Sequence, residues 1–267
     1  MSDKSGIEWT DATWNPITGC NKVSEGCKNC YAERMALRLQ KMGAPRYTNG
    51  FKVTPHPDVL EKPLHWTRPR RIFVNSMSDL FHPDVSDEFI RAVWTTMAMA
   101  PQHTFQVLTK RPRRMFELLD AWEQEGLTLR EGYGSVLPNV WLGVSVENQR
   151  RADERIPHLM QTPAAVRFLS CEPLLGPIEL DGIWGYPGAA DSEQLAVWPI
   201  HWVIAGGESG PGACPMDAEW ARSLRDQCAT AGVPFFFKQW GGQRTAQGGH
   251  NEALLDGELW KQMPNAG

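Results

Sequence analysis

An alternation of apolar runs with helical segments constrains the fold of this chain more than any other feature. Short runs rich in Val, Ile and Phe each end in a polar cluster, and they span residues 71–79, 104–112, 140–148, 166–173, 201–209 and 233–241. Runs of this kind are typical of strands buried in a parallel sheet. A further strand is expected near Trp14 to Thr18.

Segments with helical spacing lie between several of these runs. They cover residues 31–42, 87–100, 113–124, 148–161 and 217–232. Strand and helix therefore alternate, which predicts an α/β protein. The number of strands favours a (β/α) TIM-type barrel, complete or partial, with parallel strands. A doubly wound sheet is the structural alternative.

Length and composition bound the domain organisation. With 267 residues, of which 42% are hydrophobic and 22% charged, the chain fits one domain. We therefore expect a single domain over residues 1–267, with a C-terminal extension from about residue 242. Residues 126–138 and 183–199 interrupt the alternation and are interpreted as surface insertions.

Charge and hydropathy indicate which partners and which compartment suit this chain. The formal net charge is −4, which argues against a general basic field that would attract nucleic acid. Local basic clusters remain, at Arg70–Arg71 and among Lys110, Arg111, Arg113 and Arg114. No signal peptide and no run of about 18 apolar residues is found, so we expect a cytoplasmic protein without a membrane partner. In a reducing compartment, cysteines serve metal binding, catalysis or packing more often than disulfides.

Three cysteines lie close together in the stretch CNKVSEGCKNC, at Cys20, Cys27 and Cys30. They follow the first expected strand and precede the first helix. In a (β/α) barrel such a loop lies at the C-terminal ends of the strands, where active sites are built. The sequence therefore predicts a metal site on this loop.

Two kinds of metal site fit three thiols. A structural zinc ion needs a fourth ligand, and the chain would have to recruit a distant residue such as His82 or Cys171. A [4Fe-4S] cluster normally takes four thiolates, so three would leave one iron open for another ligand. An open iron is what the reductive cleavage of S-adenosylmethionine requires.

Polar residues at other strand ends have both structural and functional interpretations. Asn75, Ser76, Ser78 and Asp79 suit a helix cap or a turn as well as a ligand contact, and Glu147 and Asn148 suit the cap of the following helix. The run GGESGPG lacks the Lys-Ser or Lys-Thr pair of a nucleotide P-loop, and glycine-driven turn formation explains much of it.

Several longer motifs carry a resemblance to a known family. They are WNPITGCNKVSEGCKNCYAER, NSMSDLFH, LTKRP, GVSVEN, SCEPLLGPI, GGESGPGA and FFFKQWG, and they span nearly the whole chain. The set resembles a phage-encoded family of three-cysteine proteins that is similar to the radical S-adenosylmethionine superfamily, with cysteine placement distantly like that of spore photoproduct lyase. Six residues separate Cys20 from Cys27, where the superfamily usually has three.

The resemblance implies a set of site residues. Cys20, Cys27 and Cys30 would bind a [4Fe-4S] cluster. The residues expected to contact S-adenosylmethionine are Ser76, Ser78 and Asp79 at its amino group, Ser145, Glu147 and Asn148 at its ribose, and Gly206, Gly207 and Glu208 near its adenine or carboxylate. As candidate catalytic residues, Cys171 would give a hydrogen atom to a product radical, unless it is a buried structural cysteine, and Lys238 would meet the substrate.

Two functions follow from these observations. The first is a radical enzyme that makes a 5′-deoxyadenosyl radical and acts on a nucleic-acid base or nucleoside, with a reductant protein as partner. Trp14, Trp240 and the Arg111–Arg114 cluster would then receive a flat, anionic substrate. The alternative is a non-catalytic zinc- or iron–sulfur-binding nucleic-acid module. The sequence assigns no role to Cys214 or Cys228.

Overall fold

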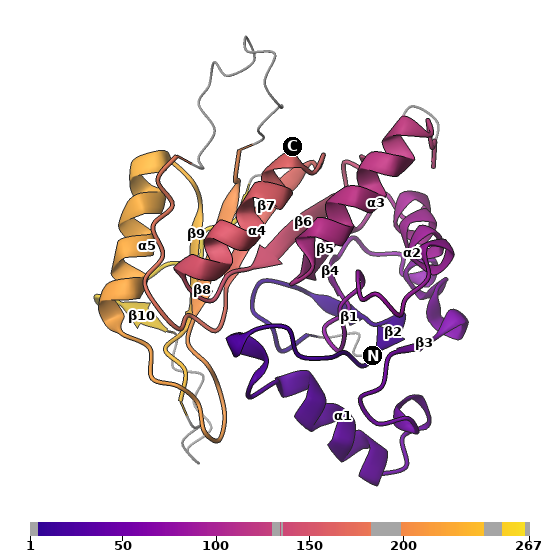
Figure 1. Ribbon diagram of the computed structural model, residues 1–267, viewed down its shortest axis with the longest axis horizontal. Coiled ribbons are helices and arrows are strands. Elements are labelled where there is room, and N and C mark those ends of the chain that lie inside the picture. The colour runs from indigo at the N-terminus through magenta and orange to yellow at the C-terminus, as the bar shows by residue number, and fades with distance from the viewer. Residues whose placement is uncertain (1–4, 130–133, 135, 183–198, 243–252, 265–267) are drawn as a thin grey trace. The chain divides into compact units, whose positions relative to one another are not determined.

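The computed structural model describes residues 5–129, 134, 136–182, 199–242 and 253–264 (Figure 1). The chain comprises two compact units. The first is formed by Met1–Gly143 with Thr162–Ala165, and the second by Val144–Gln161 with Val166–Gly267. Most residues of the two expected insertions lie outside the described part of the chain.

The first unit is built on parallel strands. Strands β1 (Ala12–Trp14), β4 (Arg71–Val74) and β5 (Thr104–Thr109) pair in that order. Its helices are α1 (Tyr31–Lys41), α2 (Asp87–Met99) and α3 (Pro112–Gln124). Short 3-10 helices are η1 (Glu25–Cys27), η2 (Pro45–Tyr47), η3 (Pro57–Val59) and η4 (Lys62–His65). A small antiparallel pair joins β2 (Ile17–Thr18) to β3 (Thr54–Pro55).

The second unit repeats the parallel arrangement. Strands β7 (Val166–Cys171), β8 (Trp202–Gly206) and β9 (Phe235–Gln239) pair in that order, and the helices are α4 (Gln149–Gln161) and α5 (Ala218–Ala231). Strand β6 (Val140–Ser145) spans the boundary between the units. A hairpin of β10 (Leu254–Leu255) and β11 (Glu258–Leu259) follows, and Lys261 then bridges back to Phe236 in β9.

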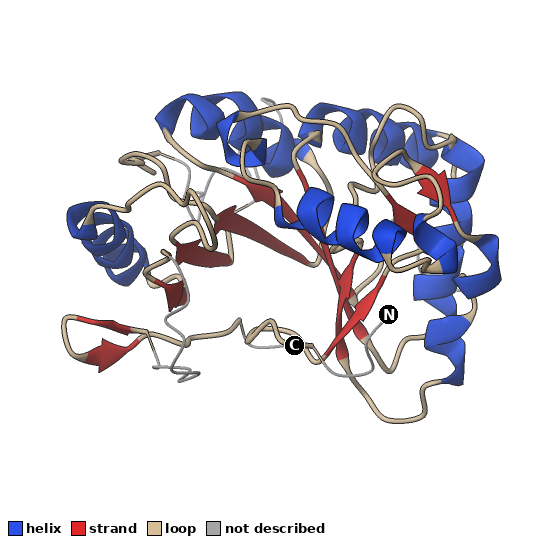
Figure 2. Cartoon of the chain, turned by 90° about the horizontal axis from the view of Figure 1, so that it is seen from below, coloured by secondary structure: helices blue, strands red, loops and turns tan. Residues whose placement is uncertain are grey.

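The strand order settles the fold class. It runs β1-β4-β5-β6-β7-β8-β9, in step with the sequence, and helices lie between the strands along the chain. Figure 2 distinguishes the two kinds of element, with strands in red and helices in blue. A doubly wound sheet reverses its strand order at a switch point, so this order excludes that alternative. Within the described residues β1 and β9 stand at opposite ends of the order. The predicted α/β fold is therefore confirmed, as a partial (β/α) TIM-type barrel.

Local sequence explains where the elements begin and end. The Ser86 hydroxyl accepts a hydrogen bond from the backbone N–H of Phe89 and starts α2. Gly232 has a φ of 68°, in the left-handed region that favours glycine, and it ends α5. Strands β6 and β7 are buried at every position, which is why their sequences read as continuous apolar runs.

The first expected strand is divided in two. Strand β1 ends at Trp14, and Ile17–Thr18 instead pairs antiparallel with β3. Between them the Asn15 side-chain oxygen accepts from the backbone N–H of Met77 at 3.2 Å, which turns the chain toward the segment after β4. The expected strand near Trp14 to Thr18 overlaps β1 only at Trp14, and it merged two short elements that belong to different sheets.

Large aromatic side chains fill the core of each unit. Trp14 is completely buried against Phe105, with ring centroids 5.9 Å apart, and its indole N–H donates to the carbonyl of Val59. In the second unit Trp202 packs on Phe168 at 5.7 Å. The prediction that Trp14 stacks on a substrate is wrong, because no face of its ring is accessible. None of the described helices is both long and apolar enough to span a bilayer.

Candidate functional site

The start of the cysteine loop is fixed to the rest of the first unit. The Gly19 N–H donates to the carbonyl of Met77 at 3.0 Å, and the Cys20 N–H donates to that of Phe51 at 3.1 Å. Gly19 has a φ of 84°, and a Cβ there would lie 2.1 Å from the carbonyl oxygen of Lys52. Only glycine fits this position, so the backbone itself sets where Cys20 stands.

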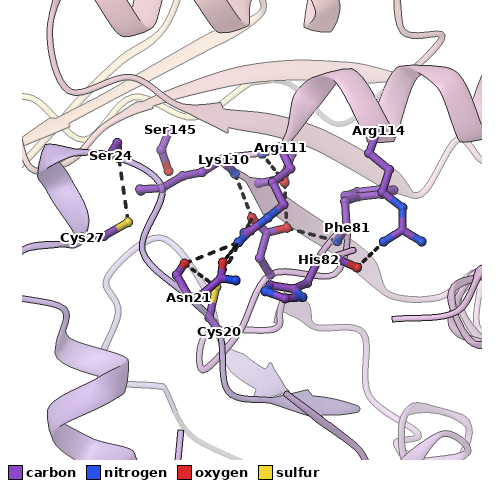
Figure 3. Close-up of polar contacts among 12 residues, drawn as sticks. Cys20, Asn21, Ser24, Cys27, Phe81, His82, Lys110, Arg111, Arg114 and Ser145 are labelled. Atoms are coloured by element: carbon purple, nitrogen blue, oxygen red, sulfur yellow. Dashed lines mark hydrogen bonds and ion pairs between the residues drawn. The ribbon is translucent and has the colours of Figure 1, made fainter. Parts of the chain in front are cut away.

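The Cys20 thiol lies beside a guanidinium. Arg111 Nη1 is 3.5 Å from Cys20 Sγ, and the thiol donates to the carbonyl of Asn21 at 3.4 Å (Figure 3). Burial raises the pKa of Cys20, and the Asp79 carboxylate adds to this, while Arg111 opposes it. Without a bound metal the group is therefore a neutral thiol near pH 7.

Arg111 is held by a buried carboxylate. Its Nη1 lies 2.9 Å from Asp79 Oδ2, with side chains 12% and 8% exposed, and its Nη2 donates to Asn21 Oδ1 at 2.6 Å. Burial is the largest single influence on the pKa of Arg111 and acts to lower it, but the contacts with Asp79 and Cys20 together outweigh burial and the pKa is raised. Asp79 also accepts from the Thr109 hydroxyl and the Phe81 and Lys110 N–H groups (Figure 3).

The other two cysteines stand on ordered turns of the same loop. Cys27 ends η1, where its N–H donates to the Ser24 carbonyl and its Sγ is 3.8 Å from Ser24 Oγ. Cys30 is the N-cap of α1, and its carbonyl accepts from the Arg34 N–H at 3.2 Å. The loop thus carries its thiols on three separate local structures.

The donor set fits an iron–sulfur cluster by its chemistry. Cys20, Cys27 and Cys30 are all free thiols of intermediate exposure. Among the described residues, however, no three His, Cys, Asp or Glu side chains stand close enough together to hold a metal ion. The number and type of ligands match the cluster, and binding requires the thiols to gather.

His82 lies in the same region with a defined proton position. It is 1% exposed, and together with Cys20 it lines a cavity of about 700 Å³. Its Nδ1 accepts from the Asp84 N–H at 3.1 Å, and burial lowers its pKa, so the neutral ring carries its proton on Nε2. Within the described part of the chain, Nε2 has no hydrogen-bond partner. A protonated Nε2 cannot ligate zinc, so this arrangement does not favour His82 as the fourth ligand of a zinc site.

The predicted cofactor residues after β4 bind their own chain. The Ser76 hydroxyl donates to Asn15 Oδ1 at 3.2 Å and the Ser78 hydroxyl donates to the Ile17 carbonyl at 2.9 Å. Asp79 is occupied by Arg111 and three other donors, as described above. These side chains fasten the base of the cysteine loop, and their contact with the amino group of S-adenosylmethionine stays a prediction.

The predicted ribose residues lie in the second unit. Glu147 is completely buried and forms an ion pair with Arg155 at 2.9 Å, while Arg155 also donates to the carbonyl of Ser145. The Asn148 side chain accepts from the Arg151 N–H at 3.1 Å and so caps α4. The capping interpretation of Asn148 is confirmed, and a ligand role for these three residues stays a prediction.

The glycine pair after β8 serves close packing between strands. A Cβ at Gly207 would lie 2.0 Å from the carbonyl oxygen of Trp240, and the Gly207 N–H donates to the Gln239 carbonyl at 2.9 Å. Glu208 is 7% exposed and accepts from the Cys214 N–H at 2.8 Å. This contact closes the turn after β8, so the glycine-rich run has the structural role that the sequence left open.

Three polar side chains, Ser170, Glu172 and Lys238, interact at the ends of β7 and β9. Lys238 Nζ lies 2.8 Å from Glu172 Oε1, and the Ser170 hydroxyl donates to Glu172 Oε2 at 3.3 Å. Gly206 makes room between the strands, since a Cβ there would meet Glu172 Oε1 at 3.2 Å. Cys171, in contrast, is completely buried, and burial raises its pKa well above the ordinary value. Cys171 therefore stands in a structural position, and a substrate contact of Lys238 stays a prediction.

The arginines around Arg111 form ion pairs and hydrogen bonds within the protein. Arg114 donates to the carbonyls of His82 and Val85 and pairs with Asp87 at 2.6 Å, and Arg113 pairs with Glu117 at 2.7 Å. Sequence analysis recognised the cluster as charge but missed the contact of Arg111 with the cysteine loop. The position of LTKRP directly after a strand was the one signal for it.

The residues expected around one S-adenosylmethionine molecule are divided between the two units. Ser78 and Asp79 lie in the first unit beside the loop of Cys20, whereas Ser145, Glu147 and Glu208 lie in the second. Each group is ordered within its own unit. That the two groups share one pocket stays a prediction.

Comparison with known proteins gives a family but no activity. No curated protein matches the chain. One solved structure, described as spore photoproduct lyase complexed with dinucleoside spore photoproduct, is similar with a TM-score of 0.42 and 12% sequence identity, covering 84% of this chain and 74% of that chain. A likeness at this level carries no argument about activity. Residues 4–264 match the family described as protein of unknown function (DUF5131), and the chain belongs to that family.

Proposed function

We propose that the protein is a radical S-adenosylmethionine-type enzyme that binds a [4Fe-4S] cluster on Cys20, Cys27 and Cys30. The observation that carries the proposal is the three-thiol loop between β1 and α1. Its first member is placed by the backbone of Gly19 and by Arg111. A three-thiol loop suits a cluster with one open iron better than a closed zinc site.

Neither of the two residues that the sequence offered as a fourth zinc ligand is well placed for that role. His82 presents a proton on Nε2, which makes it a hydrogen-bond donor rather than a ligand. Cys171, the other residue considered, is completely buried in the second unit. The radical enzyme is therefore favoured over the zinc-binding module.

The bound cluster would supply the electron that cleaves S-adenosylmethionine to methionine and a 5′-deoxyadenosyl radical. The chain's own residues would orient and shield the reactants. Arg111 holds Cys20 in place, and Asp79 holds Arg111. His82, which lines the same pocket as Cys20, is itself almost completely buried.

For the substrate we propose a nucleic-acid base or nucleoside. Trp240, at the end of β9, is 37% exposed and offers an aromatic face, next in sequence to Gln239 and two residues after Lys238. Stacking on such a face contributes about 1–3 kcal/mol per base. Lys238 paired with Glu172 can hold a proton or a polar group of the substrate at the same strand end.

Anaerobic reconstitution with iron and sulfide tests this function. We expect absorbance near about 400 nm, with iron and sulfide bound to the loop. On reduction with S-adenosylmethionine present, we expect 5′-deoxyadenosine and methionine by mass spectrometry. A chain that binds one zinc ion and never yields 5′-deoxyadenosine would instead support the nucleic-acid module.

A nucleic-acid titration then addresses the substrate class. Turnover of S-adenosylmethionine is measured with DNA, with RNA and with free nucleosides, using W240A as the variant and W260A as its control, because Trp260 also lies in the second unit. Stimulation by one of these substrates that is lost in W240A supports the proposal. Turnover that no nucleic acid changes would remove the substrate class and leave the radical chemistry in place.

A further inference from the structure

Helix α1 presents an unusual solvent-facing side. Tyr31, Leu37 and Met42 are 62%, 44% and 68% exposed, and several exposed apolar side chains on one helix are more informative than a single one. At 100° per residue these positions share one side of the helix with Arg34, Arg38 and Lys41, which are also exposed. We call this set the α1 face. It consists of Tyr31, Arg34, Leu37, Arg38, Lys41 and Met42.

The α1 face has one sign of charge. Three of its six residues are cations and none, in this fully described helix, is acidic. Glu33 is the one acidic residue of α1, and it pairs with Lys22 at 3.0 Å on another side of the helix. The whole chain carries a net charge of −4, so the face differs in sign from the molecule around it. Such a face attracts an acidic partner.

Its apolar content indicates a protein partner rather than a nucleic acid. Interfaces between proteins are enriched in Tyr, Met and Arg, and an apolar centre with a charged rim is their usual composition. Single-stranded nucleic acids are bound through several aromatic platforms. The α1 face offers one aromatic ring, with Leu37 and Met42 as its other apolar groups.

The helix begins at the cysteine loop. Cys30, the third thiol, is the N-cap of α1, and its carbonyl accepts from the N–H of Arg34, which belongs to the α1 face. A protein bound to this face would therefore lie within about one helical turn of a thiol of the loop. Figure 1 shows α1 at the edge of the ribbon, directly after the loop in the chain.

We infer that the α1 face docks a small acidic electron carrier, one that holds a flavin or an iron–sulfur group. The inference rests on the proposed function, because the cluster needs a source of electrons. In the docked pair one electron passes from the carrier to the cluster, so the carrier is oxidised by one electron and the cluster is reduced by one. The face sets which reductant is accepted, and the loop receives the electron.

The first experiment measures binding and needs no cluster. Fluorescently labelled flavodoxin and ferredoxin serve as the probes, and the affinity of the metal-free protein is measured by anisotropy at several salt concentrations. R34Q/R38Q/K41Q should weaken binding about tenfold at low salt and flatten its salt dependence, because exposed charges act through screened attraction. The matched control R91Q/R113Q/R150Q removes the same charge from other exposed positions and should change affinity less than about twofold.

An apolar variant separates packing from charge. L37Q/M42Q keeps the charge of the face and should weaken binding at all salt concentrations equally. If the wild-type protein binds neither carrier, or if the control variant weakens binding as much as R34Q/R38Q/K41Q, the inference is overturned. Tighter binding of a short DNA by the same three cations would also overturn it.

The second experiment measures reduction of the reconstituted protein. With dithionite, a small reductant that needs no docking surface, the R34Q/R38Q/K41Q variant should be reduced at the wild-type rate. With the reduced carrier, its rate should fall about tenfold, in proportion to affinity. A wild-type protein that holds no iron refutes the proposed function, while the binding experiment still decides the docking. A loaded protein with equal rates for all variants refutes the docking alone.

Discussion

The guanidinium of Arg111 lies 3.5 Å from the sulfur of Cys20, although 91 positions separate the two residues in the chain. The same nitrogen is 2.9 Å from Asp79. Asp79, which follows β4, is thus linked to the cysteine loop by Arg111, which follows β5. The cysteine loop is therefore attached to two strand ends by one shared side chain.

Removing that arginine should loosen the loop and destabilise the first unit. In R111A the mostly buried Asp79 loses its cation, so we expect the free energy of unfolding to fall by about 1–3 kcal/mol, with less iron retained after reconstitution. Urea unfolding and iron analysis measure the two effects. R113A is the control, because the guanidinium of Arg113 is exposed and pairs with Glu117 on the helix surface. Equal losses in both variants would show that Arg111 has no special role.

The three cysteines should act together in binding iron. In C20A/C27A/C30A we expect iron and sulfide to fall to background after anaerobic reconstitution, because no thiol remains on the loop. C214A removes another thiol of intermediate exposure and should retain the wild-type content. Full iron and sulfide in the triple variant would refute the cluster assignment.

Gly19 should tolerate no side chain. Both G19A and G43A place a Cβ at a left-handed backbone position, at a cost of about 1–2 kcal/mol. Only at Gly19 does the Cβ also meet the Lys52 carbonyl, at 2.1 Å, whereas nothing lies within 4 Å at Gly43. G19A should therefore lose more stability than G43A and bind less iron. Matching thermal unfolding curves for the two variants would contradict the packing described here.

The buried ion pair of Glu147 and Arg155 should depend on both partners. The side chains of Glu147 and Arg155 are 0% and 2% exposed, so R155M removes the cation that faces a buried carboxylate and should cost about 3–5 kcal/mol in unfolding free energy. The double variant E147L/R155M removes both charges and should recover most of this loss. If the double variant is as unstable as R155M, the pair does not act as a unit. If both retain wild-type stability, Glu147 is not buried as described.

Buried histidines should make the protein less stable as the pH falls. His103 is 1% exposed and its Nε2 lies 3.1 Å from the Pro63 carbonyl, and burial lowers its pKa below 6.5. Below pH 6.5 the histidine is protonated in the unfolded chain but still neutral in the folded protein. The free energy of unfolding therefore decreases as the pH falls from 6.5 toward the pKa of the folded state. Comparing urea unfolding of wild type and H103Q across this range isolates the contribution. Parallel pH profiles for the two proteins would exclude it.

The sequence predicted the fold well because strand and helix leave local signals. Apolar runs such as Val166–Cys171 read directly as buried strands, and capping residues such as Ser86 fixed helix starts. Interruption of the first strand after Trp14 was not readable, since the contact of Asn15 with Met77 joins residues far apart in the chain. Burial of Trp14 was hidden for the same reason.

The site was predicted in its residue types more than in its contacts. The spacing of Cys20, Cys27 and Cys30 predicts a metal-binding loop without any structure. The partners of Asp79 could not be read from the sequence, because a carboxylate after a strand suits a ligand and an internal ion pair equally. Three-dimensional packing decides between these two roles, and in this structure Asp79 forms an ion pair with Arg111.

The division of the cysteine loop among three local structures determines how much ordering remains for metal binding. Gly19 fixes Cys20, η1 carries Cys27, and the first turn of α1 carries Cys30, so folding has already restricted each thiol. In the proposed cluster the thiols would have to gather through movement of the residues between these pieces. Since loop-closure entropy grows with the number of free residues, a loop built from ordered pieces loses little entropy when its sulfurs close on a shared centre.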